Sequence, residues 1–65
     1  MNRTKVLFVS NTGWYLYNFR LPLAEQLRAR GVDVVMVSPH DEYVSRLEKA
    51  GFRWIPLDME RRSMN

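Results

Sequence analysis

The chain has 65 residues, with 10 lysines and arginines against 7 aspartates and glutamates, one histidine and no cysteine. A chain of this length forms one small domain at most and buries only about 60% of its unfolded surface. The lack of cysteine excludes a disulfide and a thiolate metal site, and it fits a reducing compartment. The net charge of +3 is mild, with basic and acidic residues mixed along the chain, and it slightly favours an anionic partner. The partners that we expect do not include nucleic acid. No apolar run approaches the roughly 18 residues of a membrane span, and the run near the N-terminus is too short for a signal-peptide core.

Three short apolar segments predict three strands. The runs from Val6 to Val9 and from Val34 to Val37 are continuous rather than alternating, which indicates strands buried on both faces of a parallel sheet. A third strand begins at Phe52 and is closed by Pro56 and Leu57.

The pattern between the first two strands predicts a helix from about Asn18 to Arg30. Asn18 suits the N-cap, and a later start with Pro22 at the first helical position fits equally well. Gly31 is expected to end the helix in a left-handed conformation. Apolar residues recurring every four positions predict the buried stripe, namely Phe19, Leu23 and Leu27 with Ala24 beside them. The expected water-facing residues are Glu25, Gln26, Arg28 and Arg30.

A second, shorter helix is predicted before the third strand. Ser38 is its expected cap, Pro39 lies in the first turn, and Asp41 stands where a capping box places an acid. The helix macrodipole is a sufficient reason for an acid at this position. Gly51 is the expected C-terminal glycine of this helix.

These elements define an α/β fold, a Rossmann-like β-α-β-α-β unit with a parallel three-stranded sheet in the order 3-2-1. Both helices then cover one face of the sheet, and the second face of two apolar strands stays bare. We interpret residues 1–65 as the first part of a larger doubly wound domain; the alternative is a chain that associates through the bare face.

The segment from Asn11 to Arg20 is the candidate site, because ligands of open parallel sheets bind at the carboxyl ends of strands. Its aromatic residues are unusual for a connector, although Phe19 and Leu16 could equally plug the core. Both the G-x-G-x-x-G and the Walker patterns are absent. Arg20, expected in the first turn of the helix, could hold a phosphate bidentately or be an ordinary surface arginine. The predicted substrate-binding residues are Asn11, Thr12, Gly13, Trp14, Tyr15, Asn18 and Arg20.

We predict no catalytic or metal-ligating residue in this chain. His40 follows the second strand, but a lone histidine in a helix start is more often an exposed polar residue than a catalyst. No second histidine or cysteine supports a metal site. The stretch from Asp58 to Asn65 carries no periodic pattern.

The run VLFVSNTGWYLYNFRLPLAEQLRARGVDVVMVSP, followed by EYVSRLEKAGFRWIPLDMERRSMN, resembles the beginning of bacterial family-4-like glycosyltransferases of the GT-B fold. The resemblance extends from Lys5 to the end, and its most specific parts are the NTGWYLYNFR loop and the ERRSMN end. It implies that residues 1–65 are the N-terminal part of the acceptor-side domain of a GT-B enzyme, with the donor-binding C-terminal domain absent. The implied reaction moves a hexose or N-acetylhexosamine from a nucleotide sugar to a polyprenyl-diphosphate-linked or other cell-envelope glycan acceptor. The resemblance implies no metal and no cofactor. It implies a nucleotide-sugar donor for the full-length protein.

Gly13 matches the first-loop glycine of this family, but the second glycine of many members is replaced by Thr12 or Trp14. That difference puts direct phosphate contact by the loop in doubt. We expect the chain alone to be inactive and self-associating, and the parent protein to be cytoplasmic, with peripheral contact at the inner face of the cell membrane. The alternative function is a small Rossmann-like interaction module that self-associates through the uncovered sheet face. A nucleotide-binding half of an oxidoreductase is disfavoured because the glycine fingerprint is missing.

Overall fold

The structure, a computed structural model, describes residues 4–58 of the chain. In chain order its elements are β1 (Lys5–Val9), α1 (Gly13–Tyr15), η1 (Leu16–Arg20), α2 (Leu21–Ala29), β2 (Asp33–Ser38), α3 (Val44–Lys49) and β3 (Arg53–Pro56). The strand order is β1-β2-β3 and both pairings are parallel, which is the predicted order 3-2-1 read from the other edge. The predicted β-α-β-α-β fold is confirmed. The predicted lack of pattern in the tail falls mostly on residues 59–65, which lie outside the described residues.

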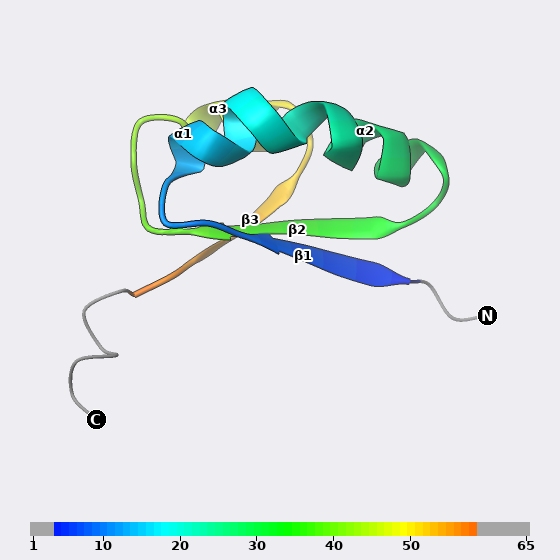
Figure 1. Ribbon diagram of the computed structural model, residues 1–65, viewed down its shortest axis with the longest axis horizontal. Coiled ribbons are helices and arrows are strands. Elements are labelled where there is room, and N and C mark those ends of the chain that lie inside the picture. The colour runs from blue at the N-terminus through cyan, green and yellow to red at the C-terminus, as the bar shows by residue number, and fades with distance from the viewer. Residues whose placement is uncertain (1–3, 59–65) are drawn as a thin grey trace.

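The helices within residues 4–58 all lie on one side of the sheet (Figure 1). β2 is the central strand, with Val35 paired to Leu7 of β1 and to Arg53 of β3. Within residues 4–58 no element covers the opposite side of the sheet, as predicted. We call this side the open sheet face. It exposes Leu7, Val9 and Ile55, whose exposed fractions are 52%, 61% and 44%.

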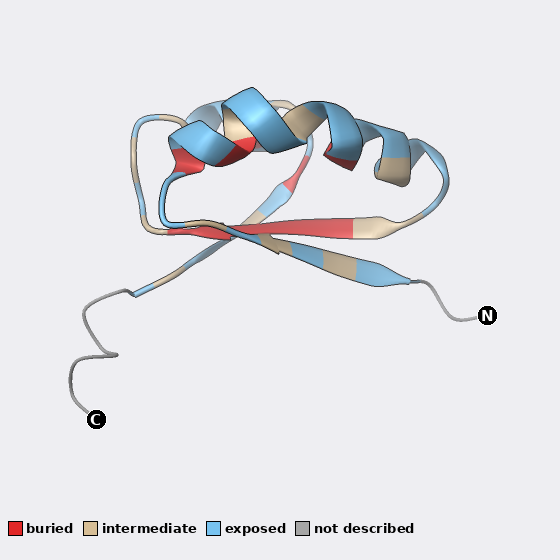
Figure 2. Ribbon diagram, viewed as in Figure 1, coloured by how far each residue is buried: buried red, intermediate tan, exposed pale blue. Residues whose placement is uncertain are grey.

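The two continuous apolar runs therefore differ in how far their side chains are buried. β2 is buried from Val34 through Ser38, as predicted, because β1 and β3 flank it on its two edges (Figure 2). β1 alternates between exposed and half-buried residues, so the prediction of two-sided burial is wrong for β1 in this chain. The reason is position: β1 lies at an edge, and side chains of successive residues point to opposite faces. Phe8 packs against the core while its neighbours Leu7 and Val9 lie on the open sheet face.

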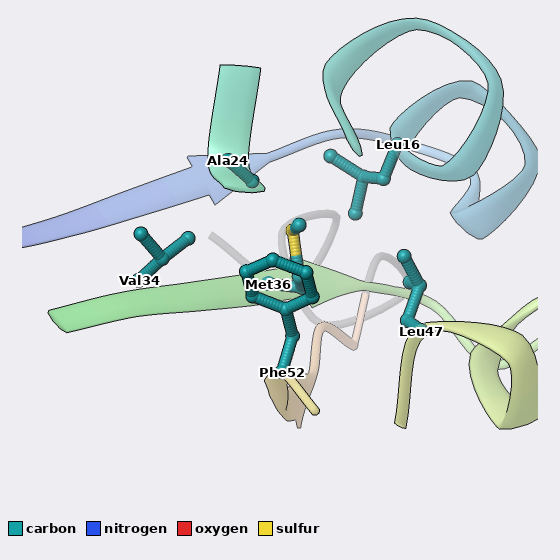
Figure 3. Close-up of a cluster of buried hydrophobic side chains, with 6 residues drawn as sticks. All are labelled: Leu16, Ala24, Val34, Met36, Leu47 and Phe52. Atoms are coloured by element: carbon teal, nitrogen blue, oxygen red, sulfur yellow. The ribbon is translucent and has the colours of Figure 1, made fainter. Parts of the chain in front are cut away.

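The core lies between the helices and the central strand (Figure 3). Met36 of β2 is fully buried in a cluster with side chains from η1, α2 and α3 and with Phe52, the residue before β3. The cluster consists of Leu16, Ala24, Val34, Met36, Leu47 and Phe52. Full burial of one large apolar side chain contributes about 1.5–3 kcal/mol, so these few contacts supply much of the stability of so small a unit.

The first helical stretch begins at Gly13, five residues before the predicted start at Asn18. Its N-cap is Thr12, whose hydroxyl accepts a hydrogen bond from the Tyr15 amide at 3.1 Å. The prediction of Asn18 as N-cap is wrong. Asn18 lies inside the helical stretch, where its side-chain amide donates to the Trp14 carbonyl at 2.9 Å. Thr12 and Asn18 are both capping residue types, and the sequence pattern alone favoured the wrong one.

A π-helical turn, η1, explains why the buried stripe differs from prediction. It directly precedes α2, whose second residue is Pro22; the proline ring has no N–H to donate and crowds the preceding turn of a regular helix. A π turn is wider than an α turn, so it changes which of the residues before α2 face the sheet. Leu16 and Ala24 are buried, while Phe19 and Leu23 are 54% and 47% exposed. The predicted stripe is thus correct for Ala24 and partly for Leu27, and wrong for Phe19 and Leu23.

The second helix begins later than predicted. β2 continues through Ser38, and α3 begins at Val44 after the cap residue Tyr43. Ser38 is buried, and its hydroxyl donates to the Pro39 carbonyl and accepts from the Trp54 indole at 3.1 Å. The prediction of Ser38 as a helix cap is therefore wrong. The two helix-ending glycines are confirmed, with φ of 88° at Gly31 and 94° at Gly51.

Candidate functional site

Two loops meet at the carboxyl edge of the sheet. One joins β1 to α1 and the other joins β2 to α3, and they lie at the same end of the sheet in Figure 1. The strand ends are tied by a hydrogen bond from the Ser10 amide to the Val37 carbonyl at 3.0 Å. Ligands of open parallel sheets bind at this edge.

The Asp41 carboxylate joins these two loops. Its Oδ2 accepts hydrogen bonds from the Gly13 amide at 2.8 Å and the Trp14 amide at 3.1 Å. Its Oδ1 accepts from the Tyr43 amide at 3.0 Å. Asp41 therefore caps α1 and the turn before α3 together. The sequence interpretation of Asp41 as an acid at the start of its own helix missed the contact with Gly13, 28 residues away.

The position of the Asp41 carboxylate explains why residue 13 is a glycine. Gly13 is buried, and a Cβ atom added there would collide with the Asp41 carboxylate. The glycine thus permits close approach of an internal carboxylate. With Thr12 holding the Tyr15 amide, the first three amides of α1 all have partners within the chain. The contacts of Gly13 and Thr12 within the chain therefore stabilise the loop itself.

Exposed aromatic side chains gather on the outer side of α1 and η1. Trp14, Tyr15 and Phe19 are 46%, 36% and 54% exposed. The Phe19 ring centroid lies 5.5 Å from that of Trp14 in an edge-on arrangement and 5.1 Å from that of Tyr15. The Arg20 guanidinium lies over the Tyr15 ring, 5.2 Å from its centroid. We call Trp14, Tyr15, Phe19 and Arg20 the aromatic–arginine patch.

The patch unites three predicted site residues, Trp14, Tyr15 and Arg20, and adds Phe19. Arg20 is the last residue of η1, so its predicted position in the first turn is wrong. At 1.5 Å per residue it lies roughly 10 Å along the helix from Gly13, and it reaches the patch through its contact with Tyr15. Asn11 is exposed on the loop before the cap. The Asn18 side-chain amide donates a hydrogen bond to the backbone carbonyl of Trp14.

A second group of side chains lies around the end of β2 and comprises Ser38, His40 and Trp54 of β3. His40 is exposed and lies edge-on to Trp54, with ring centroids 5.9 Å apart. Trp54 in turn bonds to Ser38. No acid or second histidine is recorded in contact with His40 among the described residues, so the arrangement gives it no partner for acid–base catalysis.

The described part of the chain offers no metal site, because no three histidine or acidic side chains in it come together. None of its helices has the length and apolar character needed to cross a bilayer.

The fold and its edge define a Rossmann-like α/β unit whose ligand edge carries aromatic residues and an arginine in place of a glycine-rich phosphate loop. Residues 5–65 match the family described as Glycosyl transferase 4-like. The chain belongs to this family, and the expected resemblance is confirmed.

One curated relative is the N,N'-diacetylbacillosaminyl-diphospho-undecaprenol alpha-1,3-N-acetylgalactosaminyltransferase of Campylobacter jejuni. It is 33% identical over 61 residues, which cover 94% of this chain and 16% of the relative. The chain thus spans about a sixth of the length of that enzyme. No solved structure gives a significant match to the chain.

Proposed function

We propose that this chain is the N-terminal, acceptor-side segment of a glycosyltransferase that moves an N-acetylhexosamine or hexose from a nucleotide sugar to a polyprenyl-diphosphate-linked acceptor. Family membership supports the reaction class. The name of the Campylobacter relative, which specifies transfer of N-acetylgalactosamine to a diphospho-undecaprenol-linked sugar, supports the acceptor class. We infer that the protein acts on such an acceptor at the cytoplasmic face of the cell membrane, with peripheral contact.

The observation that carries the acceptor role is the aromatic–arginine patch beside the carboxyl edge. An exposed indole offers a flat apolar surface on which a sugar ring or a prenyl unit can pack. A guanidinium is the side chain best suited to bind a phosphate through two parallel hydrogen bonds. Trp14 and Arg20 lie on the same exposed side of the helix, linked through Phe19 and Tyr15. A sugar diphosphate on a lipid carries both chemical groups.

The donor is assigned to a part of the protein beyond this segment, in agreement with the resemblance to two-domain GT-B enzymes. The amides at the start of α1, which hold a phosphate in dinucleotide-binding folds, are occupied by Asp41 and Thr12. The described residues bring together no pair of side chains suited to acid–base catalysis.

The isolated 65-residue chain is therefore expected to bind an acceptor analogue without transferring sugar. A farnesyl-diphosphate-linked N-acetylhexosamine should change the tryptophan fluorescence of the chain, whereas UDP-N-acetylgalactosamine should not. The Trp14→Phe variant should lose this response while keeping Trp54 as an internal reference. Sugar transfer by the pure chain, or a response to the nucleotide sugar alone, would contradict the division of roles.

A second function, self-association, is favoured by the open sheet face. Leu7, Val9 and Ile55 expose apolar side chains there, and contiguous exposed apolar surface drives association. This surface would serve an interaction module, the alternative to an enzyme segment.

The isolated chain is accordingly expected to sediment as a concentration-dependent oligomer. Val9→Lys should shift the distribution toward monomer by placing a charge on the open sheet face. Leu23→Lys is the matched control, because Leu23 is similarly exposed but lies on the helix side. A monomer independent of concentration, or equal effects of the two variants, would show that the open sheet face does not mediate association.

A further inference from the structure

The proposed function leaves the Asp41 carboxylate without a role beyond the fold. Asp41 comes from the loop after β2, yet two of its three hydrogen bonds go to Gly13 and Trp14 at the start of α1. Those two amides belong to the first turn, where backbone N–H groups have no partner inside the helix. Their protection therefore depends on this one side chain.

The carboxylate occupies the position that an anionic ligand takes in related geometries. Helix starts at the carboxyl edge of parallel sheets bind phosphate through their free amides. Here a negative charge from the chain itself already satisfies the Gly13 and Trp14 amides. A phosphate approaching the same amides would meet a like charge at short range, which is unfavourable. Asp41 thus excludes phosphate from the start of α1 and leaves the exposed Arg20 guanidinium of the patch as an anion-binding group.

The same bonds fix the backbone of Trp14. Its amide donates to Asp41 at 3.1 Å, and its carbonyl accepts from the Asn18 side chain at 2.9 Å. Trp14 is therefore held on both sides while nearly half of its side chain is exposed. The indole can present a defined surface to a ligand because its backbone cannot easily shift.

We propose that Asp41 is a positioning residue for acceptor recognition, which holds Trp14 in the aromatic–arginine patch and keeps phosphate off the start of α1. This proposal rests on the acceptor role proposed above. Asp41 itself touches the loop, and it acts on the acceptor through Trp14.

The first test is amide hydrogen exchange on the 65-residue chain. In Asp41→Asn, one amide oxygen cannot serve both loops, so exchange at Gly13, Trp14 and Tyr43 should accelerate about tenfold or more, as expected for loss of hydrogen bonds to a charged acceptor. Exchange at the central Met36 should stay unchanged, which separates local loosening from unfolding. Glu42→Gln is the matched control: it removes the same charge one residue away, from an exposed side chain with no recorded bond among the described residues. Equal exchange in wild type and Asp41→Asn would overturn the proposal.

A second variant changes Gly13, the other residue of the contact between Gly13 and Asp41. Gly13→Ala adds a methyl group where the Asp41 carboxylate lies, so it should displace the carboxylate without removing it. It should accelerate exchange at Trp14 and Tyr43 as Asp41→Asn does, although alanine is otherwise the better helix former. Inorganic phosphate is the probe for exclusion: it should slow exchange of the freed amides in Asp41→Asn and have no effect in wild type. Phosphate protection in the wild type would contradict the exclusion.

The last test uses an active glycosyltransferase that carries this segment. Asp41→Asn should raise the acceptor KM about five- to tenfold, with donor KM and kcat close to wild type, because only the positioning of the acceptor surface is lost. Glu42→Gln should leave all three constants unchanged. Faster exchange with an unchanged acceptor KM would limit Asp41 to a structural role and overturn the proposal. A wild-type enzyme that does not use a polyprenyl-diphosphate acceptor would overturn the proposed function itself, before any variant is compared.

Discussion

Replacing Arg20 with alanine is expected to lower acceptor kcat/KM about ten- to a hundredfold in an active glycosyltransferase that carries this segment. The expected factor follows from a hydrogen-bonded contact between an arginine and a phosphate, which contributes about 1.5–3 kcal/mol. Arg20 is exposed, and its guanidinium is steadied by the Tyr15 ring 5.2 Å away. Donor affinity should barely change, because we propose that the donor binds outside this segment. Steady-state kinetics with each substrate varied separately measure both effects.

The control for this variant is Arg30→Ala, at the C-cap of α2, the helix that follows η1. Its side chain makes no recorded contact among the described residues, so its loss should be nearly silent. Arg28, which the sequence placed on the same water-facing side, is less suitable. It donates to the Ala50 carbonyl at 2.8 Å, and its guanidinium lies 4.2 Å from the centroid of the Phe52 ring. Equal acceptor kinetics of Arg20→Ala and Arg30→Ala would remove Arg20 from the site.

The order of the elements could be predicted because it depends on local signals. Continuous apolar runs marked β1 and β2, and Gly31 and Gly51 marked the helix ends through a conformation that other residues adopt at a cost. Short connections between parallel strands then leave few possible topologies. These signals each span a handful of residues, so a single sequence contains them in full.

The start of the first helix could not be predicted from the same kind of signal. Thr12 and Asn18 are both residue types that favour the N-cap position. Pro22 favoured a start later than Thr12, because proline is common at the first helical position. The π turn before Pro22 breaks the 3.6-residue period on which the buried stripe was based. The periodic pattern therefore placed Phe19 and Leu23 in the core, although both are exposed. That exposure is what makes Phe19 part of the candidate site.

The contact between Asp41 and Gly13 could not be predicted from the sequence for a different reason. Asp41 and Gly13 are 28 residues apart, and each has a sufficient local explanation: an acid near a helix start and a glycine in a loop. Only the parallel pairing of β1 with β2 brings their loops together. The departure from the family's double glycine gave a partial signal, because it argued against phosphate contact by this loop.

Leu47→Ala is expected to unfold most of the isolated chain at physiological temperature. Leu47 is fully buried in the core beside Met36 and Phe52. Truncating a buried leucine to alanine costs about 2–5 kcal/mol, since the lost burial is joined by a residual cavity. A domain of this size has a total stability of roughly 3–10 kcal/mol. Thermal melting followed by circular dichroism should show the midpoint lowered by roughly 10 °C or more.

The matched control is Leu23→Ala, the same chemical change at a residue that the helical period alone would place in the core. In the structure Leu23 is 47% exposed on α2, so its truncation removes little buried surface. Alanine also has the higher helix propensity, and the midpoint should change by a few degrees at most. A loss of stability at Leu23 as large as that at Leu47 would mean that α2 turns Leu23 toward the sheet, contrary to its 47% exposure in the structure.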